Sequence, residues 1–343
     1  MYYRKGHTKV LFLIFVILLL TNCATKYYVA PELPEEIQVE RIPLTGPVSS
    51  CDSEISGLAW YNDYLILLPQ YPSRFESDYD GKLFAISKET ILSFLNGKTD
   101  LTITPIEVDF VAPGISYRIN GYEGFEAIAF SGNKVFMTIE SSPNNMLGYL
   151  INGEIQSDLS TIILDTDKIT EIQAQTSINN AADETIFSTF DKVITIYEGN
   201  GKNANPFPIA HVFDHNLNLL ETISFPNIEY RITDATSLDA DNCFWVINYF
   251  YPGDENAYNP SVDSISIVYG EEATHSKYTT MERLLRLKYS ESEITLVQEA
   301  PIQLELINDN NARNWEGIVR LDNIGFLLVT DKYPETILGF VRK

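Results

Sequence analysis

Short apolar runs separated by turn-forming residues recur along the chain, which is the pattern expected of consecutive β-strands. Five of these runs come shortly after an Asn or Asp: residues 64–69, 134–139, 185–190, 243–250 and 325–330. Only residues 88–95, KETILSFL, have the pattern of a helix, and it is a short one. We therefore predict an all-β protein.

A shorter motif precedes each of these runs and repeats at intervals of 50 to 80 residues. It starts with a polar residue, continues with a small and an aliphatic residue, and ends at the Asn or Asp turn. The five motifs begin at Ser56, Glu126, Thr176, Thr236 and Glu316. Motif, turn and apolar run together predict a hairpin, and further apolar runs bring each repeat to about four strands.

Four-stranded units repeated at this interval are typical of β-propeller blades. We predict a single domain over residues 36–343, a five-bladed β-propeller, with six blades as the alternative if a long insertion contains one more. A β-sandwich is the other possibility. The last repeat has three predicted strands, and residues 36–44 have the pattern of a strand that would complete this blade and protect its edge.

Residues 1–22 have the pattern of an export signal, since three basic residues precede the apolar run at residues 10–20. The following LTNC resembles the cleavage site of a bacterial lipoprotein signal, with Asn22 where a small residue is usual. We expect a lipid on Cys23, a tether over residues 23–35, and a protein anchored in the bacterial cell envelope, at the outer membrane. The alternative is an ordinary secretory signal.

The 24 basic residues are outnumbered by 47 acidic ones, which gives a formal net charge of −23. This charge argues against nucleic acid as a partner, and leaves the lipid on Cys23 as the expected membrane contact. It favours solubility, a monomer and the binding of cations. Cys51 and Cys243 fall in distant repeats, so two separate thiols are expected.

The first strand of a propeller blade lies innermost, so the first residues of the five motifs are expected to surround the central channel at one end. All five have oxygen donors, and Glu126 and Glu316 are carboxylates that repel each other unless a cation or proton compensates. Oxygen donors without His or Cys favour Ca²⁺ over Zn²⁺. We predict a central Ca²⁺ held by Ser56, Glu126, Thr176, Thr236 and Glu316. Alternatively, these side chains bind only strand ends and water.

Basic residues occur in several segments that are predicted to reach the same end of the channel: Arg74, Arg118, Arg231, Arg313 and Lys332. Guanidinium groups bind phosphate and carboxylate in a bidentate manner, so a basic rim would attract an anionic ligand. The alternative is that each basic residue pairs with a nearby carboxylate. The long loop at residues 248–264 either covers this end or projects from the surface.

No sequence motif for nucleophilic catalysis is present, and His211, His215 and His275 lie in predicted connections. If the protein is an enzyme, we expect metal-assisted hydrolysis, in which Glu126 or Glu316 positions a water molecule.

Residues 123–140 and 314–341 resemble the repeats of the esterase-like phytase propellers and of the SdiA-regulated type of exported propeller. A more distant resemblance is to the calcium-activated nucleotidases, a five-bladed family with a central Ca²⁺ held by Ser and Glu at blade starts. This resemblance implies Ser56, Glu126 and Glu316 as ligands, whereas Thr176 and Thr236 depart from the pattern.

Two functions follow from these features. The first is a lipid-anchored propeller that binds Ca²⁺ and an anionic small molecule at its top face and hydrolyses a phosphoester. The alternative is a non-catalytic lipoprotein that binds a ligand or an envelope protein.

Overall fold

The computed structural model describes residues 35–97, 102–271 and 273–343. The predicted signal peptide, Cys23 and nearly all of the tether lie outside the described residues, so the lipid anchor and the envelope location remain predictions. Among the described residues, no helix has both the length and the apolar character required to cross a membrane.

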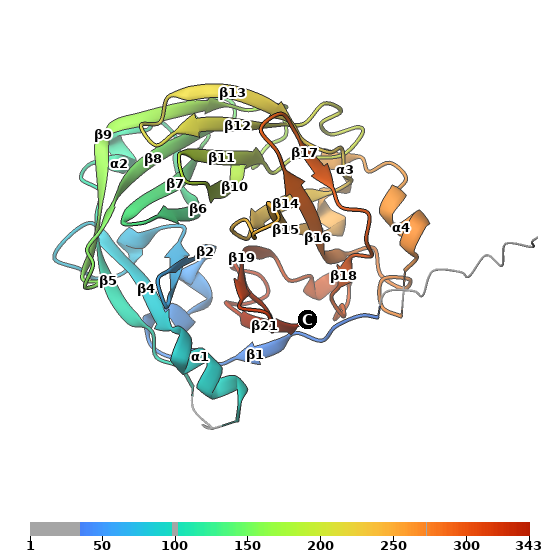
Figure 1. The fold of residues 1–343 in the computed structure, drawn as a ribbon, viewed down its shortest axis with the longest axis horizontal. Helices are drawn as coiled ribbons and strands as arrows, with labels where there is room; N and C mark the ends of the chain where they lie inside the picture. Colours follow the sequence, from blue (N-terminus) through green and yellow to red (C-terminus); the bar gives the residue numbers. More distant parts are fainter. Residues whose placement is uncertain (1–34, 98–101, 272) are drawn as a thin grey trace, which may run out of the picture. The chain divides into compact units, whose positions relative to one another are not determined.

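The first two four-stranded meanders form one sheet. They comprise β2 (Ile55–Tyr61), β3 (Tyr64–Pro69), β4 (Gly81–Ser87) and β5 (Ile106–Val111), then β6 (Tyr122–Ser131), β7 (Lys134–Ser141), β8 (Leu147–Ile155) and β9 (Thr161–Gln173). Strands within each meander are antiparallel, whereas the outer strands β5 and β9 pair in parallel and join the meanders into an eight-stranded sheet (Figure 1).

Three further sheets follow along the chain. One contains β10 (Asp183–Ser188), β11 (Lys192–Tyr197), β12 (Ile209–Asp214) and β13 (Leu219–Ser224). The next contains β14 (Arg231–Ala235), β15 (Cys243–Phe250), β16 (Met281–Tyr289) and β17 (Ile294–Leu296), with β18 (Ile302–Gln303) also paired to β16. The last contains β19 (Trp315–Leu321), β20 (Gly325–Thr330), β21 (Leu338–Arg342) and β1 (Glu40–Ile42).

The helices are short and lie in the connections. The α-helices are α1 (Lys88–Leu95), α2 (Ile115–Arg118), α3 (Glu255–Tyr258) and α4 (Ser264–Tyr269). The 3-10 turns are η1 (Pro47–Ser49), η2 (Cys51–Ser53), η3 (Pro72–Arg74), η4 (Pro252–Asp254) and η5 (Asp309–Asn311). Helix α1 has the predicted bounds, and it begins where the Ser87 side chain accepts a hydrogen bond from the Thr90 amide.

The first strands of the meanders form a closed ring. Strands β2, β6, β10, β14 and β19 contact one another in this order, and β19 contacts β2 again (Figure 1). Each meander extends outward from this ring. The arrangement is that of a β-propeller, and it differs from a sandwich, in which two sheets would pack face to face.

Side chains connect neighbouring first strands across the ring. The Ser56 hydroxyl in β2 donates to the Phe125 carbonyl in β6 at 2.7 Å, and the Thr233 hydroxyl in β14 donates to the Trp315 carbonyl in β19 at 2.6 Å. Neighbouring first strands are not paired through their backbones. These side-chain hydrogen bonds, which are buried from water, join them instead.

The predicted hairpin turns are confirmed at three of the Asn and Asp positions. Asn62, Asn242 and Asp322 have positive φ angles of 51°, 59° and 50°. Asn and Asp tolerate this left-handed conformation better than other residues that have a Cβ atom.

The predicted first strands of the third and fourth repeats were wrong. Residues 177–182 and 236–242 contain no strand, and the run at 185–190, predicted as a second strand, falls largely in β10, which is a first strand. Strand β14 ends just before Thr236. The motif found at Thr176 and Thr236 belongs to loops, because a polar–small–aliphatic pattern is also compatible with an irregular segment.

The predicted closure by an N-terminal strand is confirmed. Strand β1 pairs with β21 in an antiparallel ladder that joins Ile42 to Leu338. Ile42 is 2% exposed and packs in the same apolar cluster as Leu338 and Phe340. Closure therefore covers the edge of the last sheet and adds to the core.

Replacing Ile42 with Ala is expected to lower the free energy of unfolding by about 2–5 kcal/mol, because it removes buried apolar contacts and leaves a cavity. Glu40→Ala, an exposed change in the same strand, is the control and is expected to cost less than about 0.5 kcal/mol. Chemical denaturation measures both. Equal stabilities for Ile42→Ala and the native protein would contradict the role of β1 in closure.

Candidate functional site

Each first strand has a β-bulge near its beginning. A bulge inserts a residue that has no partner in the neighbouring strand. In β2, β10 and β19 the pairing with the second strand skips one residue, Ser56, Glu184 and Glu316, and in β6 it skips Glu123 and then Glu126. In β14 the skip covers Thr233 and Asp234. The bulges therefore set a polar side chain at the corresponding place in every first strand.

Three of the bulge residues, Glu126, Glu184 and Glu316, line one cavity of about 410 Å³, here called the channel-mouth cavity. The other acidic residues in its lining are Glu54, Glu123, Glu140 and Asp331. Among the described residues that line it, only Arg74 and Arg231 are basic. Seven carboxyl groups thus face two guanidinium groups, so ionisation of all seven would give the cavity a negative potential.

Polar residues at the ends of the second strands supply a further part of the site. Glu140 lies near the end of β7, and Gln70, Glu198 and Asp331 directly follow β3, β11 and β20. The Gln70 side-chain amide donates a 2.9 Å hydrogen bond to Glu126. The first and second strands of a meander thus present their polar side chains together.

Arg231 lies between acidic groups beside the cavity. Its guanidinium forms an ion pair with the fully buried Glu198 and is 3.9 Å from Asp254. Burial raises the pKa of Glu184 well above its usual range, the Glu198 charge adds to this, and Arg231 opposes it. Burial also raises the pKa of Glu198, with Arg231 again opposing. One guanidinium therefore faces two buried carboxyl groups, which favours retention of a proton by one of them.

Glu126 and Glu316 are in a similar environment without a cation in contact. Burial raises the pKa of Glu126 well above its usual range, and the charges of Glu140 and Glu316 raise it further. Burial and the Asp331 charge likewise raise the pKa of Glu316, which accepts a hydrogen bond from the Asn314 amide. These carboxyl groups remain protonated well above their ordinary pKa unless a cation replaces the protons.

Three oxygen atoms in the lining are buried and have no hydrogen-bond partner among the described residues: Glu140 Oε1, Asn314 Oδ1 and Asp331 Oδ1. Burial, then the charge of Glu198, raises the pKa of Glu140 to about 8. Burial raises the pKa of Asp331 to about 6. Buried oxygens without a partner are costly, so they indicate a missing donor or cation.

The lining contains the oxygen ligands that Ca²⁺ prefers and no His or Cys. Within the described part of the chain, however, no group of three or more His, Cys, Asp or Glu side chains is already arranged to hold a metal ion. Binding of a cation would therefore need rotations of these side chains.

Three of the five predicted ring residues, Ser56, Thr176 and Thr236, are not in the cavity lining, and Thr176 and Thr236 do not begin first strands as predicted. Thr176 lies in a loop with its hydroxyl 3.1 Å from that of Tyr197. Thr236 follows β14, and its hydroxyl accepts from the Trp245 amide at 3.1 Å. The bulge of β10 places Glu184 in the lining instead, whereas Asp234 in the bulge of β14 lies outside the lining and accepts a 2.8 Å hydrogen bond from the Ile318 amide. Ser56 has the predicted place in the ring, but its hydroxyl hydrogen is used in the bond to β6.

The predicted basic residues are divided between different parts of the structure. Arg74 and Arg231 line the channel-mouth cavity. Arg118 is 3.0 Å from Asp167, and Arg313 is 2.8 Å from the buried Glu282, with no part in the cavity lining.

Two of these basic residues share one acidic partner. Arg74 forms an ion pair with Glu54, and Lys332 lies 2.7 Å from the same carboxylate. Arg118, Arg231 and Arg313 also have acidic partners. All five predicted basic residues therefore pair with a carboxylate, as the alternative prediction stated.

The long loop at residues 248–264 contains the end of β15, η4 and α3. It reaches the site through Asp254, which is near Arg231, and through Tyr258, which is buried. Cys51 and Cys243 are both free, as predicted; the first is exposed and the second buried.

Sequence reasoning missed Glu140, Glu184 and Asp331. A signal was present for two of them, because Glu140 and Asp331 directly follow the apolar runs at 134–139 and 325–330. Glu184 directly precedes the third run. It could have been predicted only if that run had been recognised as a first strand.

Comparison with models of protein families and with curated proteins finds no match. Among solved structures, the chain is similar to a glucose dehydrogenase, with 10% identity, a TM-score of 0.46, and coverage of 89% of this chain and 99% of that one. It is also similar to the soluble aldose sugar dehydrogenase of Escherichia coli, with 7% identity, a TM-score of 0.44, and coverage of 90% and 100%.

A third similar structure is a bifunctional GH43-CE protein of Bacteroides eggerthii, with 10% identity and a TM-score of 0.47. This match covers 88% of the chain but only 34% of that protein. Identities and TM-scores of this size carry no argument about the chemistry of the chain.

The raised pKa of Glu140 predicts a pH dependence of stability. Between its ordinary value of 4.5 and about 8, the unfolded state has lost this proton while the folded state keeps it. Stability without metal is therefore expected to fall as pH rises through this range. Glu140→Gln should reduce the fall, and the exposed Glu89→Gln should not. Thermal unfolding in chelator between pH 5 and about 8 measures this; identical profiles for all three proteins would contradict it.

Proposed function

We propose that the chain is a five-bladed β-propeller whose channel-mouth cavity binds Ca²⁺. The observation that carries the proposal is that three bulge glutamates, Glu126, Glu184 and Glu316, share one cavity with buried oxygens that have no partner. The blade count is supported by the ring of first strands, if each half of the eight-stranded sheet is taken as one blade.

The charge balance favours a cation. Six carboxyl groups of the lining form no ion pair with any described residue: Glu123, Glu126, Glu140, Glu184, Glu316 and Asp331. The two guanidinium groups are already paired with Glu54 and Glu198. An anionic ligand alone would add charge of the same sign, whereas a divalent cation reduces the repulsion.

The ligands would be Glu126, Glu184 and Glu316, assisted by Glu140, Asp331 and the side-chain oxygen (Oδ1) of Asn314. All are hard oxygen donors, and Ca²⁺ accepts six to eight such donors in flexible geometries. A bound Ca²⁺ supplies the positive charge through which an anionic oxygen, such as that of a phosphoester, binds at this mouth. Arg74 and Arg231 stand at the same cavity and would contact such an anion once the cation offsets the carboxylates.

Hydrolysis of a phosphoester is the second candidate function. It agrees with the resemblance of residues 123–140 and 314–341 to the esterase-like phytase propellers. In this case Glu126 or Glu316 would orient the attacking water. The alternative is a non-catalytic propeller that holds a ligand or an envelope protein.

Addition of Ca²⁺ is expected to stabilise the protein, by about 2.7 kcal/mol at a concentration about 100 times the Kd. Protons should be released on binding, because the cation replaces them on carboxyl groups with raised pKa. Titration calorimetry in buffers of different ionisation enthalpy measures both the Kd and the proton release. Glu184→Gln should weaken binding by at least about tenfold.

Thr176→Val is the matched control for Glu184→Gln, because Thr176 belongs to the same repeat but does not line the channel-mouth cavity. Its Kd for Ca²⁺ should equal that of the native protein. Absence of Ca²⁺ binding to the native protein, or equal loss in both variants, would contradict the proposed site.

Phosphoester hydrolysis is tested with a panel of monoesters, diesters and nucleotides. If the second candidate is correct, activity should require Ca²⁺, disappear in chelator and fall by about 10² or more in Glu316→Gln. Native protein that binds Ca²⁺ but hydrolyses no member of the panel would leave the non-catalytic alternative, which a stable partner in an envelope pull-down would support.

A further inference from the structure

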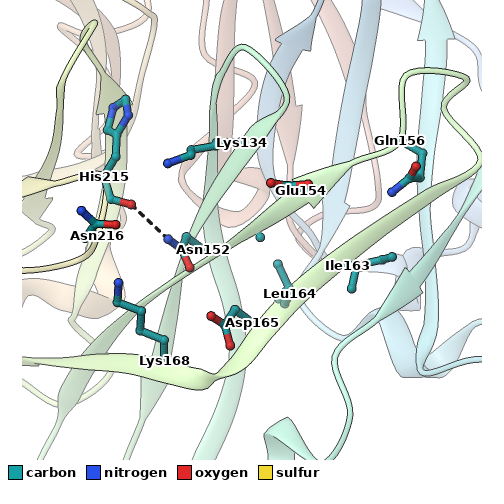
Figure 2. A pocket seen from close by; sticks show the side chains of 11 residues that line it. Lys134, Asn152, Glu154, Gln156, Ile163, Leu164, Asp165, Lys168, His215 and Asn216 are labelled. Atoms are coloured by element: carbon teal, nitrogen blue, oxygen red, sulfur yellow. Dashed lines mark hydrogen bonds between the residues drawn. The ribbon is translucent and has the colours of Figure 1, made fainter.

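A second cavity of about 400 Å³ lies on the outer part of the β7–β9 meander, next to the turn between β12 and β13 (Figure 2). It occurs where the ladder between β8 and β9 is interrupted. Ile151 pairs with Ile169 and Gly153 pairs with Leu164, so Asn152 faces the unpaired residues 165–168. This irregularity opens the sheet and turns side chains of both strands toward one space.

The backbone holds this space open. A Cβ atom at Gly153 would lie 2.2 Å from the Ile163 carbonyl oxygen, so β9 crosses β8 at a distance that only glycine permits. The Asn152 amide donates a 3.1 Å hydrogen bond to the His215 carbonyl, and the Thr170 hydroxyl donates a 2.8 Å bond to the Leu217 carbonyl. The turn from the neighbouring sheet is thereby fixed as one wall.

The lining contains two lysines, Lys134 and Lys168, that form no ion pair and no side-chain hydrogen bond with any described residue. This is unusual in a chain with 47 acidic residues against 24 basic ones. The His215 Nε2 atom is buried and has no hydrogen-bond partner among the described residues. The two ammonium groups thus have no hydrogen-bond partner among the described residues, although the charge of Lys168 helps to lower the pKa of Asp214, and the His215 ring packs against Phe136.

Of the two acidic residues in the lining, Glu154 lies apart from the lysines, whereas Asp165 lies beside Lys168 (Figure 2). In Figure 2 the amino groups of Lys134 and Lys168 lie on the same side of the cavity as His215 and Asn216, and Glu154 lies toward the other side. Lys134 and Glu154 are opposite each other in the β7–β8 ladder, yet they form no ion pair. The cavity therefore has two ammonium groups without an ion pair at one end and the hydrogen-bond acceptor Glu154 toward the other.

We propose that this cavity binds a small anionic sugar, with a carboxylate or phosphate at the two lysines and hydroxyl groups at Asn152, Asn216 and Glu154. Ammonium groups form charge-assisted hydrogen bonds with such anions, and carboxamides and carboxylates pair with hydroxyls. Asp165 and Glu154 disfavour a second anionic group on the ligand. The proposal does not depend on the function proposed for the channel-mouth cavity.

Titration calorimetry and saturation-transfer NMR of the purified protein with glucuronate, glucose 6-phosphate and glucose test the proposal. We expect saturable binding of at least one anion, with glucose at least about tenfold weaker, because it lacks the charged group. The glucuronate and phosphate arms identify which anionic group the lysines prefer. Binding should weaken as the salt concentration rises.

The double variant Lys134→Gln with Lys168→Gln should lose at least about tenfold in affinity for the preferred anion. Lys288→Gln, an exposed lysine of β16, is the control and should bind like the native protein. An unchanged thermal midpoint of the double variant confirms that it is folded. No binding of either anion to native protein, or equal binding by the double variant, would overturn the proposal.

Discussion

The site depends on one constraint, which is that several carboxyl groups are buried together at one end of the ring of first strands. Removing a carboxylate from water is expensive, and a second like charge nearby increases the cost. Glu126, Glu184 and Glu316 meet both conditions in one cavity. Arg231 and the amides of Gln70 and Asn314 compensate them in part. A proton or a bound cation must supply the remainder, which couples folding, pH and ligand binding.

The geometry that produces this constraint comes from the propeller itself. Buried hydrogen bonds between neighbouring first strands, such as Ser56 to Phe125 and Thr233 to Trp315, hold the ring closed. The bulges at the beginnings of β6, β10 and β19 then bring Glu126, Glu184 and Glu316 into one cavity. Ser56 takes part in this closure, since its hydroxyl donates to a backbone carbonyl of β6.

The sequence predicted the strands best where turn and run were both clear. The runs at 64–69, 243–250 and 325–330 coincide with β3, β15 and β20. It failed in the third repeat because β10 begins with Asp183 and Glu184, which resemble a turn before a strand. Alternation of polar and apolar residues does not distinguish a bulged first strand from a loop followed by a strand. Because of this error, the sequence analysis chose Thr176 and not Glu184, which lines the cavity.

By itself, the sequence determined the β class, the repeat, the negative charge and the presence of a closing strand within residues 36–44, of which Glu40–Ile42 form the strand, because these follow from local patterns of a few residues. Only the tertiary structure decided which charges meet. Arg313 pairs with Glu282, and the charge of Glu316 acts on Glu126. The residues of each pair are far apart in the sequence, so no local sequence pattern predicts that they meet. The pKa of each carboxyl group depends on burial, and burial exists only after the sheets have packed.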